Sequence, residues 1–370
     1  MDIKAAVVKE LNGNFQIENV VLDEPKANEV LVRIVASGIC HSDATVVDGS
    51  LPLSFPAVLG HEGAGIVEKI GANVTTVEPG DHVVLGFAYC GHCDHCKQGL
   101  PAACVDFVKL NNSGIMKDGT TPLHQGEQDL SNFFGQSSFG TYSIADENNL
   151  VKVPKDIDLR LLGPLGCGLM TGSGTVINNL EPKAGSSIVV FGTGAVGLAA
   201  LMAGNIANCD KIIAVDLHDS RLELAKELGA THTINSKNID VIEAIKEITD
   251  GKGADYAVDT TGVPVVIENA LRSLAIKGKL ATLAVSPKNI SISPTIDLVT
   301  FSRTIVGVIE GDAVPQIYIP ELINFYKKGK FPFDKFVKFY KFEEINEAFE
   351  DSKNGTTIKP IIVLDESYTF

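Results

Sequence analysis

The distribution of hydrophobic and polar residues divides the chain into regions with different patterns. Up to about residue 150, short β-like runs are separated by turns, a pattern typical of strands in a β-rich domain. From about Gly168 to Gly311, short apolar runs alternate with helical patterns such as Ser220–Leu228 and Val241–Ile248. This alternation predicts an α/β fold with a doubly wound parallel sheet covered by helices on both faces. The predicted strands are Ser187–Phe191, Lys211–Val215, His232–Ile234, Asp255–Asp259, Lys279–Val285 and Thr304–Ile309.

Two further regions complete the predicted organisation. The segment 111–138 is rich in Asn, Ser, Gly and Gln and is long enough to form a lid or a pocket wall. After Gly311 the pattern predicts helices at Pro320–Lys328 and Phe342–Ser352 and a final strand at Ile358–Leu364. Because 370 residues exceed the size of one ordinary core, we expect two domains.

The composition is that of a folded globular protein, with 45% hydrophobic and 21% charged residues. A net charge of −15 argues against binding to nucleic acid or to an anionic membrane. The apolar stretch Ile188–Ala203 is shorter than the roughly 20 residues that a membrane span needs. Met1–Leu11 lacks the basic and apolar regions of a secretory signal. We therefore expect a soluble, cytoplasmic protein.

The sharpest chemical signal is a cluster of four cysteines, Cys90-x-x-Cys93-x-x-Cys96-x7-Cys104. Four thiolates within one loop can close a tetrahedral zinc site, and without an export signal metal binding is favoured over disulfides. An iron–sulfur cluster is the rival interpretation, and unrelated buried cysteines are the third. Because four sulfur ligands leave no open position, we expect a structural role for this site.

A glycine-rich turn is the second signal. Gly192, Gly194 and Gly197 form a G-x-G-x-x-G pattern directly after a predicted strand and before an apolar helix. In this context the glycines allow a tight turn and close approach to a pyrophosphate. Asp216, at the end of the next strand, can accept from both ribose hydroxyls of NAD and would repel the extra phosphate of NADP. Arg221 could contact the same ribose, although a surface arginine on a helix explains it almost as well.

A third group is dispersed along the chain: Cys40, His61 and Cys167, with the carboxylates of Asp43 and Glu62 close by in sequence. Two thiolates and one imidazole make a zinc site whose fourth position stays open for water or substrate. Spacing alone does not link residues so far apart. Two core cysteines and a structural histidine remain the alternative.

At this point the residues resemble those of a known family. Gly38–Asp43 resembles the catalytic zinc motif of the zinc-containing medium-chain alcohol dehydrogenases, and Gly60–Gly71 resembles their second signature. The four-cysteine lobe, the glycine-rich turn and Asp216 follow in the same order. The resemblance covers essentially the whole chain, and the overall length and the segment 111–138 look most like the aryl-alcohol (benzyl alcohol) dehydrogenases.

The resemblance implies a role for each matching residue. Two zinc ions per chain are expected, one structural and one catalytic. Glu62 would lie behind the catalytic zinc as a possible transient ligand, Asp43 would orient His61, and Ser42 would bond the substrate oxygen and pass on its proton. The implied catalytic ligands are Cys40, His61 and Cys167, and the implied structural ligands are Cys90, Cys93, Cys96 and Cys104.

The resemblance also implies residues that contact the cofactor, and the sequence departs from the family pattern at one position of the proton route. His41 and Lys359 match pyrophosphate-binding positions, and Thr171 would lie beside the nicotinamide of NAD. Liver-type members use a histidine five residues after the zinc cysteine to deliver the proton to solvent, and Thr45 stands at that position here. The proton must therefore leave by another route, and Ser42 is the only group that we assign to it.

The resemblance also implies the domains. A GroES-like, β-rich catalytic domain would cover 1–168, with a structural zinc lobe at 88–106, and return at 312–370. A Rossmann domain would fill 169–311. The strand Thr304–Ile309 resembles an edge through which two such sheets pair, which predicts a homodimer or a homotetramer.

The predicted function is the zinc- and NAD-dependent oxidation of a primary, aromatic (benzyl-type) alcohol to its aldehyde by hydride transfer. Oxidation of S-hydroxymethylglutathione, or of another alcohol or polyol, is the alternative on the same scaffold. A zinc-free quinone reductase is disfavoured because Cys40, His61 and Cys167 are all present. A crystallin-like structural role is disfavoured for the same reason.

Overall fold

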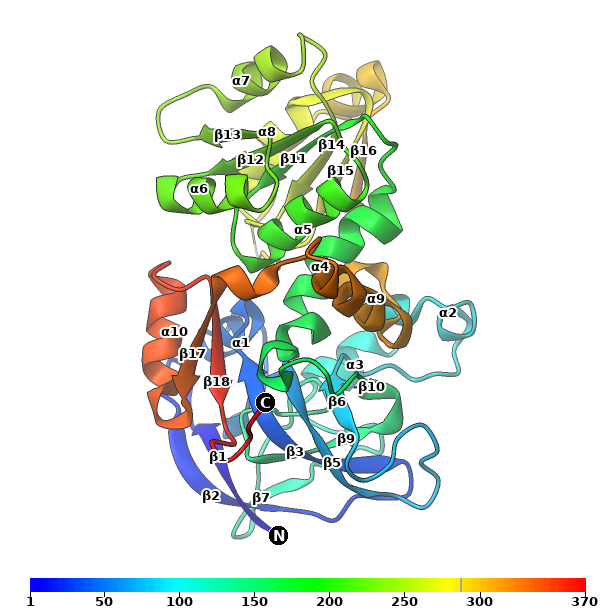
Figure 1. Ribbon diagram of the computed structural model, residues 1–370, viewed down its shortest axis with the longest axis vertical. Helices are drawn as coiled ribbons and strands as arrows, with labels where there is room; N and C mark the ends of the chain where they lie inside the picture. The colour runs from blue at the N-terminus through cyan, green and yellow to red at the C-terminus, as the bar shows by residue number, and fades with distance from the viewer. Residues whose placement is uncertain (287) are drawn as a thin grey trace. The chain divides into compact units, whose positions relative to one another are not determined.

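The computed structural model describes residues 1–286 and 288–370. Its chain divides into two compact units (Figure 1). The first unit contains Met1–Cys167, Val314–Glu321 and Asp334–Phe370, and the second contains Gly168–Ala313 and Leu322–Phe333. The segment Leu322–Phe333 thus differs from the boundary expected from the sequence. Its apolar side chains include the buried Ile323 and Phe331.

The first unit is built on two sheets. The smaller sheet has the order β4-β1-β2-β7-β8, and the larger has the order β10-β6-β5-β3-β18-β17, with β9 also pairing to β3. Apart from the parallel pair β17–β18, their ladders are antiparallel. The strands are β1 (Asp2–Val8), β2 (Gln16–Leu22), β3 (Glu29–Gly38), β4 (Ala57–Val58), β5 (Gly63–Ile70), β6 (His82–Leu85), β7 (Leu123–Gln125), β8 (Gln128–Asp129), β9 (Tyr142–Asp146), β10 (Leu150–Lys152), β17 (Val337–Lys341) and β18 (Lys359–Val363).

The segment 111–138 is more ordered than a plain loop. It begins in a short helix, α3 (Phe107–Asn112), and then forms the hairpin β7–β8 on the edge of the smaller sheet. These strands were missed in the sequence because they are short and polar and therefore give no period-two signal. The segment ends at the buried residues 133–139, which bond Leu59, Gly60 and Gly63 just before and at the start of β5.

The second unit confirms the predicted doubly wound parallel sheet, with the order β13-β12-β11-β14-β15-β16. Its helices α5–α8 pack on the strands (Figure 1). Strand β15 begins earlier than expected because Leu274 already pairs with Ala254. The strands are β11 (Ser187–Phe191), β12 (Lys211–Asp216), β13 (His232–Asn235), β14 (Ala254–Asp259), β15 (Leu274–Thr282) and β16 (Thr304–Gly307).

The helices complete both units. The helix predicted at Pro320–Lys328 begins five residues earlier, at Pro315, with Pro320 inside it. The apolar stretch Ile188–Ala203 becomes β11 followed by α5, both buried in the second unit. The helices are α1 (His41–Val47), α2 (Asp94–Lys97), α4 (Gly168–Gly174), α5 (Ala195–Ile206), α6 (Asp219–Glu227), α7 (Val241–Ile248), α8 (Pro264–Arg272), α9 (Pro315–Lys327) and α10 (Ile345–Lys353).

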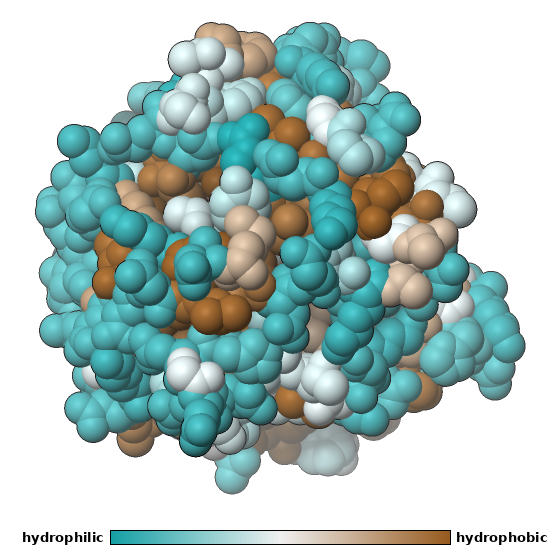
Figure 2. Space-filling model, turned by 90° about the horizontal axis from the view of Figure 1, so that it is seen from below, coloured by the Kyte–Doolittle hydropathy of each residue, from teal (hydrophilic) through white to brown (hydrophobic). Residues whose placement is uncertain are grey.

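Both hydrophilic and hydrophobic residues reach the surface (Figure 2). Figure 2 shows one face on which hydrophilic residues predominate and hydrophobic residues form separate groups. Among the described residues, no helix combines the length and the hydrophobicity that crossing a bilayer requires.

Candidate active site

The structure brings together three residues that are far apart in the sequence, Cys40, His61 and Cys167. Their ligand atoms all lie within 4.8 Å of one another. The reason is the register of the larger sheet: Ser37 in β3 pairs with Gly63 in β5, so the residues just beyond this end of both strands are neighbours. Cys167 arrives from a short 3-10 turn that ends at Gly166.

Glycines allow the chain to close around this group. A Cβ atom on Gly38 would lie 2.1 Å from the Oε2 atom of Glu62, and one on Gly163 would lie 2.1 Å from the carbonyl oxygen of Glu62. Gly60 adopts a φ of +90°, a region that L side chains rarely enter. Larger residues at these positions would displace Glu62 or His61 from the site.

His61 is fixed in an orientation that suits metal binding. Its Nδ1 lies 3.0 Å from the Oδ1 of Asp43, which also accepts the backbone N–H of Gly60 at 3.0 Å. The ring of Phe134 stacks on the imidazole at 4.6 Å between centroids, and Phe133 meets it edge-on at 5.3 Å. The Nε2 atom is buried and has no hydrogen-bond partner. With Nδ1–H donated to Asp43, this free Nε2 presents its lone pair to the cysteines, as in a histidine that binds zinc.

The charges at this site also fit a cation. A hydrogen bond from Cys167 lowers the pKa of the Cys40 thiol well below its ordinary value; burial opposes this and the charge of His61 adds to it. Burial opposes the charged form of His61, but Asp43 and Cys40 outweigh it and raise the pKa of the imidazole. The surroundings thus favour a positive charge beside Nε2, which a metal ion would supply in place of a proton. The thiolate is the form of cysteine that binds metals. The residues present therefore fit a zinc ion.

Glu62 and Lys359 form a buried ion pair behind the three ligands. The Nζ atom of Lys359 lies 3.0 and 2.9 Å from the two carboxylate oxygens, and it donates to the carbonyl oxygen of Ile39 at 2.9 Å. Both side chains are almost fully buried. Burial raises the pKa of Glu62, and Lys359 opposes that shift. In this structure the two side chains bond each other. The binding of pyrophosphate by Lys359 and that of the metal by Glu62 stay predictions.

Helix α1 carries the residues next to Cys40. Ser42 is half-buried, with its Oγ atom 4.0 Å from the Sγ atom of Cys40, whereas His41 is exposed. Thr45 is buried, and its hydroxyl donates to the carbonyl oxygen of Ser42 at 2.8 Å. This bond engages the hydroxyl proton of Thr45, and the route by which the alcohol proton leaves stays a prediction.

The four cysteines of the lobe also converge, with their sulfur atoms within 4.8 Å of one another. The backbone N–H of Cys93 donates to the Sγ of Cys90 at 3.3 Å, and that of Cys90 donates to the Sγ of Cys104 at 3.3 Å. Hydrogen bonds from Cys96 and Val105 lower the pKa of Cys93 to about 6. Burial instead raises the pKa of Cys96 to about 12 and raises that of Cys104, so among these three only Cys93 favours the thiolate without a metal. His92 and His95 are exposed.

In the second unit, the glycine-rich turn has the geometry of a phosphate-binding turn. A Cβ atom on Gly197 would lie 1.9 Å from the carbonyl oxygen of Gly192, so only glycine lets helix α5 approach strand β11 this closely. A Cβ atom on Gly194 would meet nothing within 4 Å, which leaves open space beside the start of α5. This open backbone at a helix N-terminus is suited to an anion.

Asp216 lies at the end of β12 and joins this turn. Its Oδ2 accepts the backbone N–H and the hydroxyl of Thr193 at 2.8 and 2.7 Å, and its Oδ1 accepts the N–H of Leu217 at 2.7 Å. Burial opposes the charged form, but the bonds from Thr193 outweigh it and lower the pKa of Asp216. Arg221 contributes its charge to the same shift. Thr171, on α4, lies with its hydroxyl 3.4 Å from the Oε2 of Glu310.

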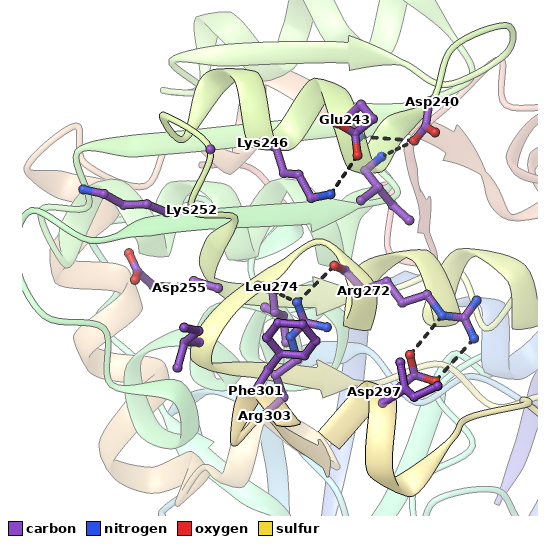
Figure 3. A pocket seen from close by; sticks show the side chains of 15 residues that line it. Asp240, Glu243, Lys246, Lys252, Asp255, Arg272, Leu274, Asp297, Phe301 and Arg303 are labelled. Atoms are coloured by element: carbon purple, nitrogen blue, oxygen red, sulfur yellow. Dashed lines mark hydrogen bonds and ion pairs between the residues drawn. The ribbon is translucent and has the colours of Figure 1, made fainter. Parts of the chain in front are cut away.

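A hollow of about 860 Å³ lies elsewhere in the second unit (Figure 3). It is lined by residues at the amino ends of the parallel strands β14 and β15, such as Asp255 and Leu274, whereas the glycine-rich turn follows the carboxyl end of β11. Several of its charges are paired internally, for example Arg272 with Asp297 at 3.1 Å. Because ligands of open α/β sheets bind at the carboxyl ends of the strands, this hollow is not the cofactor site.

The sequence did not single out Phe133, Phe134 or Gln136, although all three support the His61 region. Phe87 and Tyr89 contact each other, and Phe87 packs on Phe107 with ring centroids 5.5 Å apart. Phe87 is only 1% exposed. The only sequence signal for the missed residues was their place in the segment 111–138, since contacts across the sheet leave no local pattern.

The chain is similar to known proteins over its length. Residues 26–155 match the family model of the alcohol dehydrogenase GroES-like domain, and residues 195–328 match that of the zinc-binding dehydrogenases. A geraniol dehydrogenase of Castellaniella defragrans is 42% identical over 364 residues, which are 97% of each chain. The solved structure of a benzyl alcohol dehydrogenase of Acinetobacter calcoaceticus is 48% identical with a TM-score of 0.95, covering 99% of this chain and 100% of that one. The solved structure of an alcohol dehydrogenase zinc-binding domain protein of Burkholderia ambifaria is also 48% identical, with a TM-score of 0.96, and covers the same shares of the two chains.

The fold, the four-cysteine group and the group of two cysteines and one histidine together define an oxidoreductase that uses zinc and NAD. The chain belongs to the zinc-containing medium-chain alcohol dehydrogenase family, as its resemblance predicted.

Proposed function

We propose that this alcohol dehydrogenase oxidises primary alcohols whose reacting carbon is attached to an aromatic ring or to a carbon–carbon double bond, with benzyl-type alcohols as the first expectation. The observation that carries the chemistry is the convergence of Cys40, His61 and Cys167 around the free Nε2 of His61. The substrate class is supported by two relatives, one named for benzyl alcohol and one for geraniol. Loss of hydride from such a carbon gives a conjugated aldehyde in both cases.

We assign the site residues accordingly. The catalytic zinc is held by Cys40, His61 and Cys167, and the structural zinc by Cys90, Cys93, Cys96 and Cys104. Glu62 stands behind the catalytic zinc. The cofactor is contacted by His41, Thr171, Gly192, Gly194, Gly197, Asp216, Arg221 and Lys359. The first unit carries the catalytic centre and the second carries the dinucleotide turn.

The side chains around the reacting alcohol have separate tasks in this proposal. When bound, zinc supplies a Lewis acid for the alcohol oxygen and NAD supplies the hydride acceptor. Ser42 accepts the hydroxyl proton. Asp43 holds His61 in the tautomer that leaves Nε2 free. Ser42 passes its own hydroxyl proton onward; the Thr45 hydroxyl donates to the carbonyl of Ser42 and is given no part in this transfer.

We also propose that the chain forms a homodimer or a homotetramer through the edge of the parallel sheet. Strand β16 ends the strand order, so its outer edge offers unpaired backbone groups to a second copy.

The substrate class is tested with NAD and a panel of benzyl alcohol, geraniol, hexanol, ethanol and S-hydroxymethylglutathione. We expect kcat/KM for benzyl alcohol and geraniol to exceed that for hexanol by at least about tenfold, which is about 1.4 kcal/mol of transition-state stabilisation. If kcat/KM for hexanol equals that for benzyl alcohol and geraniol, the proposed substrate class is wrong. A higher kcat/KM for S-hydroxymethylglutathione would establish the alternative substrate. A Cys40→Ser variant controls for the assignment of the site: it should lose turnover and still bind NAD.

A further inference from the structure

Gln136 is a buried residue to which the reaction scheme above gives no task. Its side-chain amide makes three hydrogen bonds, all to the main chain. The Nε2 atom donates to the carbonyl oxygens of His61 and Gly86, both at 3.1 Å, and the Oε1 atom accepts the N–H of Gly63 at 3.2 Å. The side chain is 1% exposed, so water does not compete for these bonds.

The pattern of these bonds is that of a parallel strand. In a parallel ladder, one residue donates to the carbonyl before its partner and accepts from the N–H after it. The Gln136 amide bonds His61 and Gly63 in the same way, around Glu62. On the opposite edge of this stretch, the N–H of Gly38 donates to the carbonyl of Glu62 at 3.0 Å. The main chain that carries His61 and Glu62 is therefore held on both sides.

The amide also closes a gap in the sheet. Strands β5 and β6 pair up to Ala64 and Val84, and beyond that point they no longer bond each other. The single NH2 group of Gln136 bridges this opening by bonding His61 on one side and Gly86 on the other. The carbonyls of His61 and Gly86 would lose this partner without it.

The backbone on both sides of Gln136 has an unusual conformation that places this amide between the strands. Phe134 and Ser137 have φ values of +52° and +49°, a left-handed conformation that is costly for residues other than glycine. The turn places the Phe134 ring on the imidazole of His61. The carbonyl of Gln136 itself accepts the hydroxyl of Ser143. Such strain persists when neighbouring contacts fix the conformation, and here those contacts surround His61.

We propose that Gln136 is a positioning residue of the catalytic metal site, acting through the main chain of His61 and Gly63. It sets where the Nε2 of His61 points and so how firmly the site retains its metal. This inference rests on the proposed zinc at Cys40, His61 and Cys167. Residues that orient metal ligands typically change metal affinity or activity about 10- to 100-fold when they are replaced.

The test compares Gln136→Met, which keeps the size but removes the amide, with Asn111→Leu as a matched control. Asn111 is also 1% exposed, and its amide makes three main-chain bonds, two to Ala88 and one to Phe107. Each purified, zinc-loaded enzyme is exposed to a chelator and iodoacetamide. Peptide mass spectrometry then measures the rate at which Cys40 is alkylated, which reports on metal loss at this site rather than at the lobe.

We expect Gln136→Met to accelerate Cys40 alkylation about 10- to 100-fold and to lower kcat more than it changes KM. Asn111→Leu should lower the thermal midpoint and leave Cys40 alkylation at the wild-type rate. If Gln136→Met does not fold, Gln136→Glu retains the size and the acceptor for Gly63 and should show the same acceleration. The proposal is overturned if the Gln136 variant that folds lowers the thermal midpoint but leaves Cys40 alkylation within about twofold of wild type.

The same experiment separates this inference from the proposed function. If a chelator does not change the rate of Cys40 alkylation in the wild-type enzyme, the assignment of a metal to this site is wrong, and both proposals fail. If wild type responds to the chelator and the Gln136 variants match it, only the role of Gln136 fails.

Discussion

The ammonium of Lys359 lies 2.9 Å from the nearer carboxylate oxygen of Glu62, and the two side chains are 3% and 0% exposed. The pair joins the last strand, β18, to the chain segment that carries His61. Because both charges are removed from water, each depends on the other for compensation. The pair makes the assembly of the site dependent on residues separated by most of the chain.

Replacing Lys359 with Met should therefore destabilise the protein strongly, by about 3–5 kcal/mol, because the buried charge of Glu62 would lose its bonded cation. The double variant Lys359→Met/Glu62→Gln should regain much of that loss, since it removes both charges. Thermal unfolding midpoints of the single and double variants measure this. A double variant no more stable than Lys359→Met would mean that the ion pair is not what Lys359 contributes.

Asp216 should decide the choice between NAD and NADP. Asp216→Ala removes the carboxylate that would repel the phosphate of NADP, and the ratio of kcat/KM for NAD to that for NADP should fall by at least about tenfold, or 1.4 kcal/mol. The same change removes the bonds to Thr193, so a lower thermal midpoint is expected as well. Asp216→Asn retains an acceptor for Thr193 and separates the two effects. A wild-type enzyme that already prefers NADP would show the assignment to be wrong.

Loss of one cysteine from the lobe should affect metal content before chemistry. We expect Cys93→Ser to reduce bound zinc from about two ions per chain to about one and to lower the thermal midpoint, while kcat changes little. Cys209→Ser is the matched control, because Cys209 is outside both cysteine clusters. Metal analysis by mass spectrometry checks the outcome. Iron in the wild-type protein, or one zinc per chain, would contradict the two-site assignment.

A surface histidine should give a small pH dependence of stability. His124 lies between Asp23 at 3.1 Å and Asp129 at 2.7 Å. Burial opposes its charged form, but the bonds to the two carboxylates outweigh it and raise the pKa of His124. A histidine with a raised pKa in the folded state stabilises the protein fully below its unfolded pKa of about 6.5, and this contribution is lost as the pH rises through the folded value.

His124→Gln should consequently lower the thermal midpoint more at about pH 5.5 than at about pH 8.5. The effect should stay below about 1 kcal/mol because the carboxylates of Asp23 and Asp129 are solvent-exposed. Equal destabilisation at both pH values would show that the hydrogen bonds to His124, and not its charge, matter.

The sequence by itself determined the class of fold and the two local motifs. Alternation of apolar runs with helical patterns predicted the parallel sheet, because burial on both faces requires apolar residues at nearly every strand position. The lobe of Cys90–Cys104 and the turn of Gly192–Gly197 could be recognised because each motif is closed within a short stretch. Strand β15 was placed too late because its first residues join the sheet through an irregular register, which no local pattern records.

Only the tertiary structure decided how the separate parts form a site. Cys40 and His61 become neighbours through the register of β3 and β5, and Cys167 reaches them by a turn that glycines allow. The partnership of Lys359 with Glu62 and the three bonds of Gln136 likewise depend on strands that meet across the sheet. Pairing between distant segments has no period along the chain, so these relationships became visible only when the chain was folded.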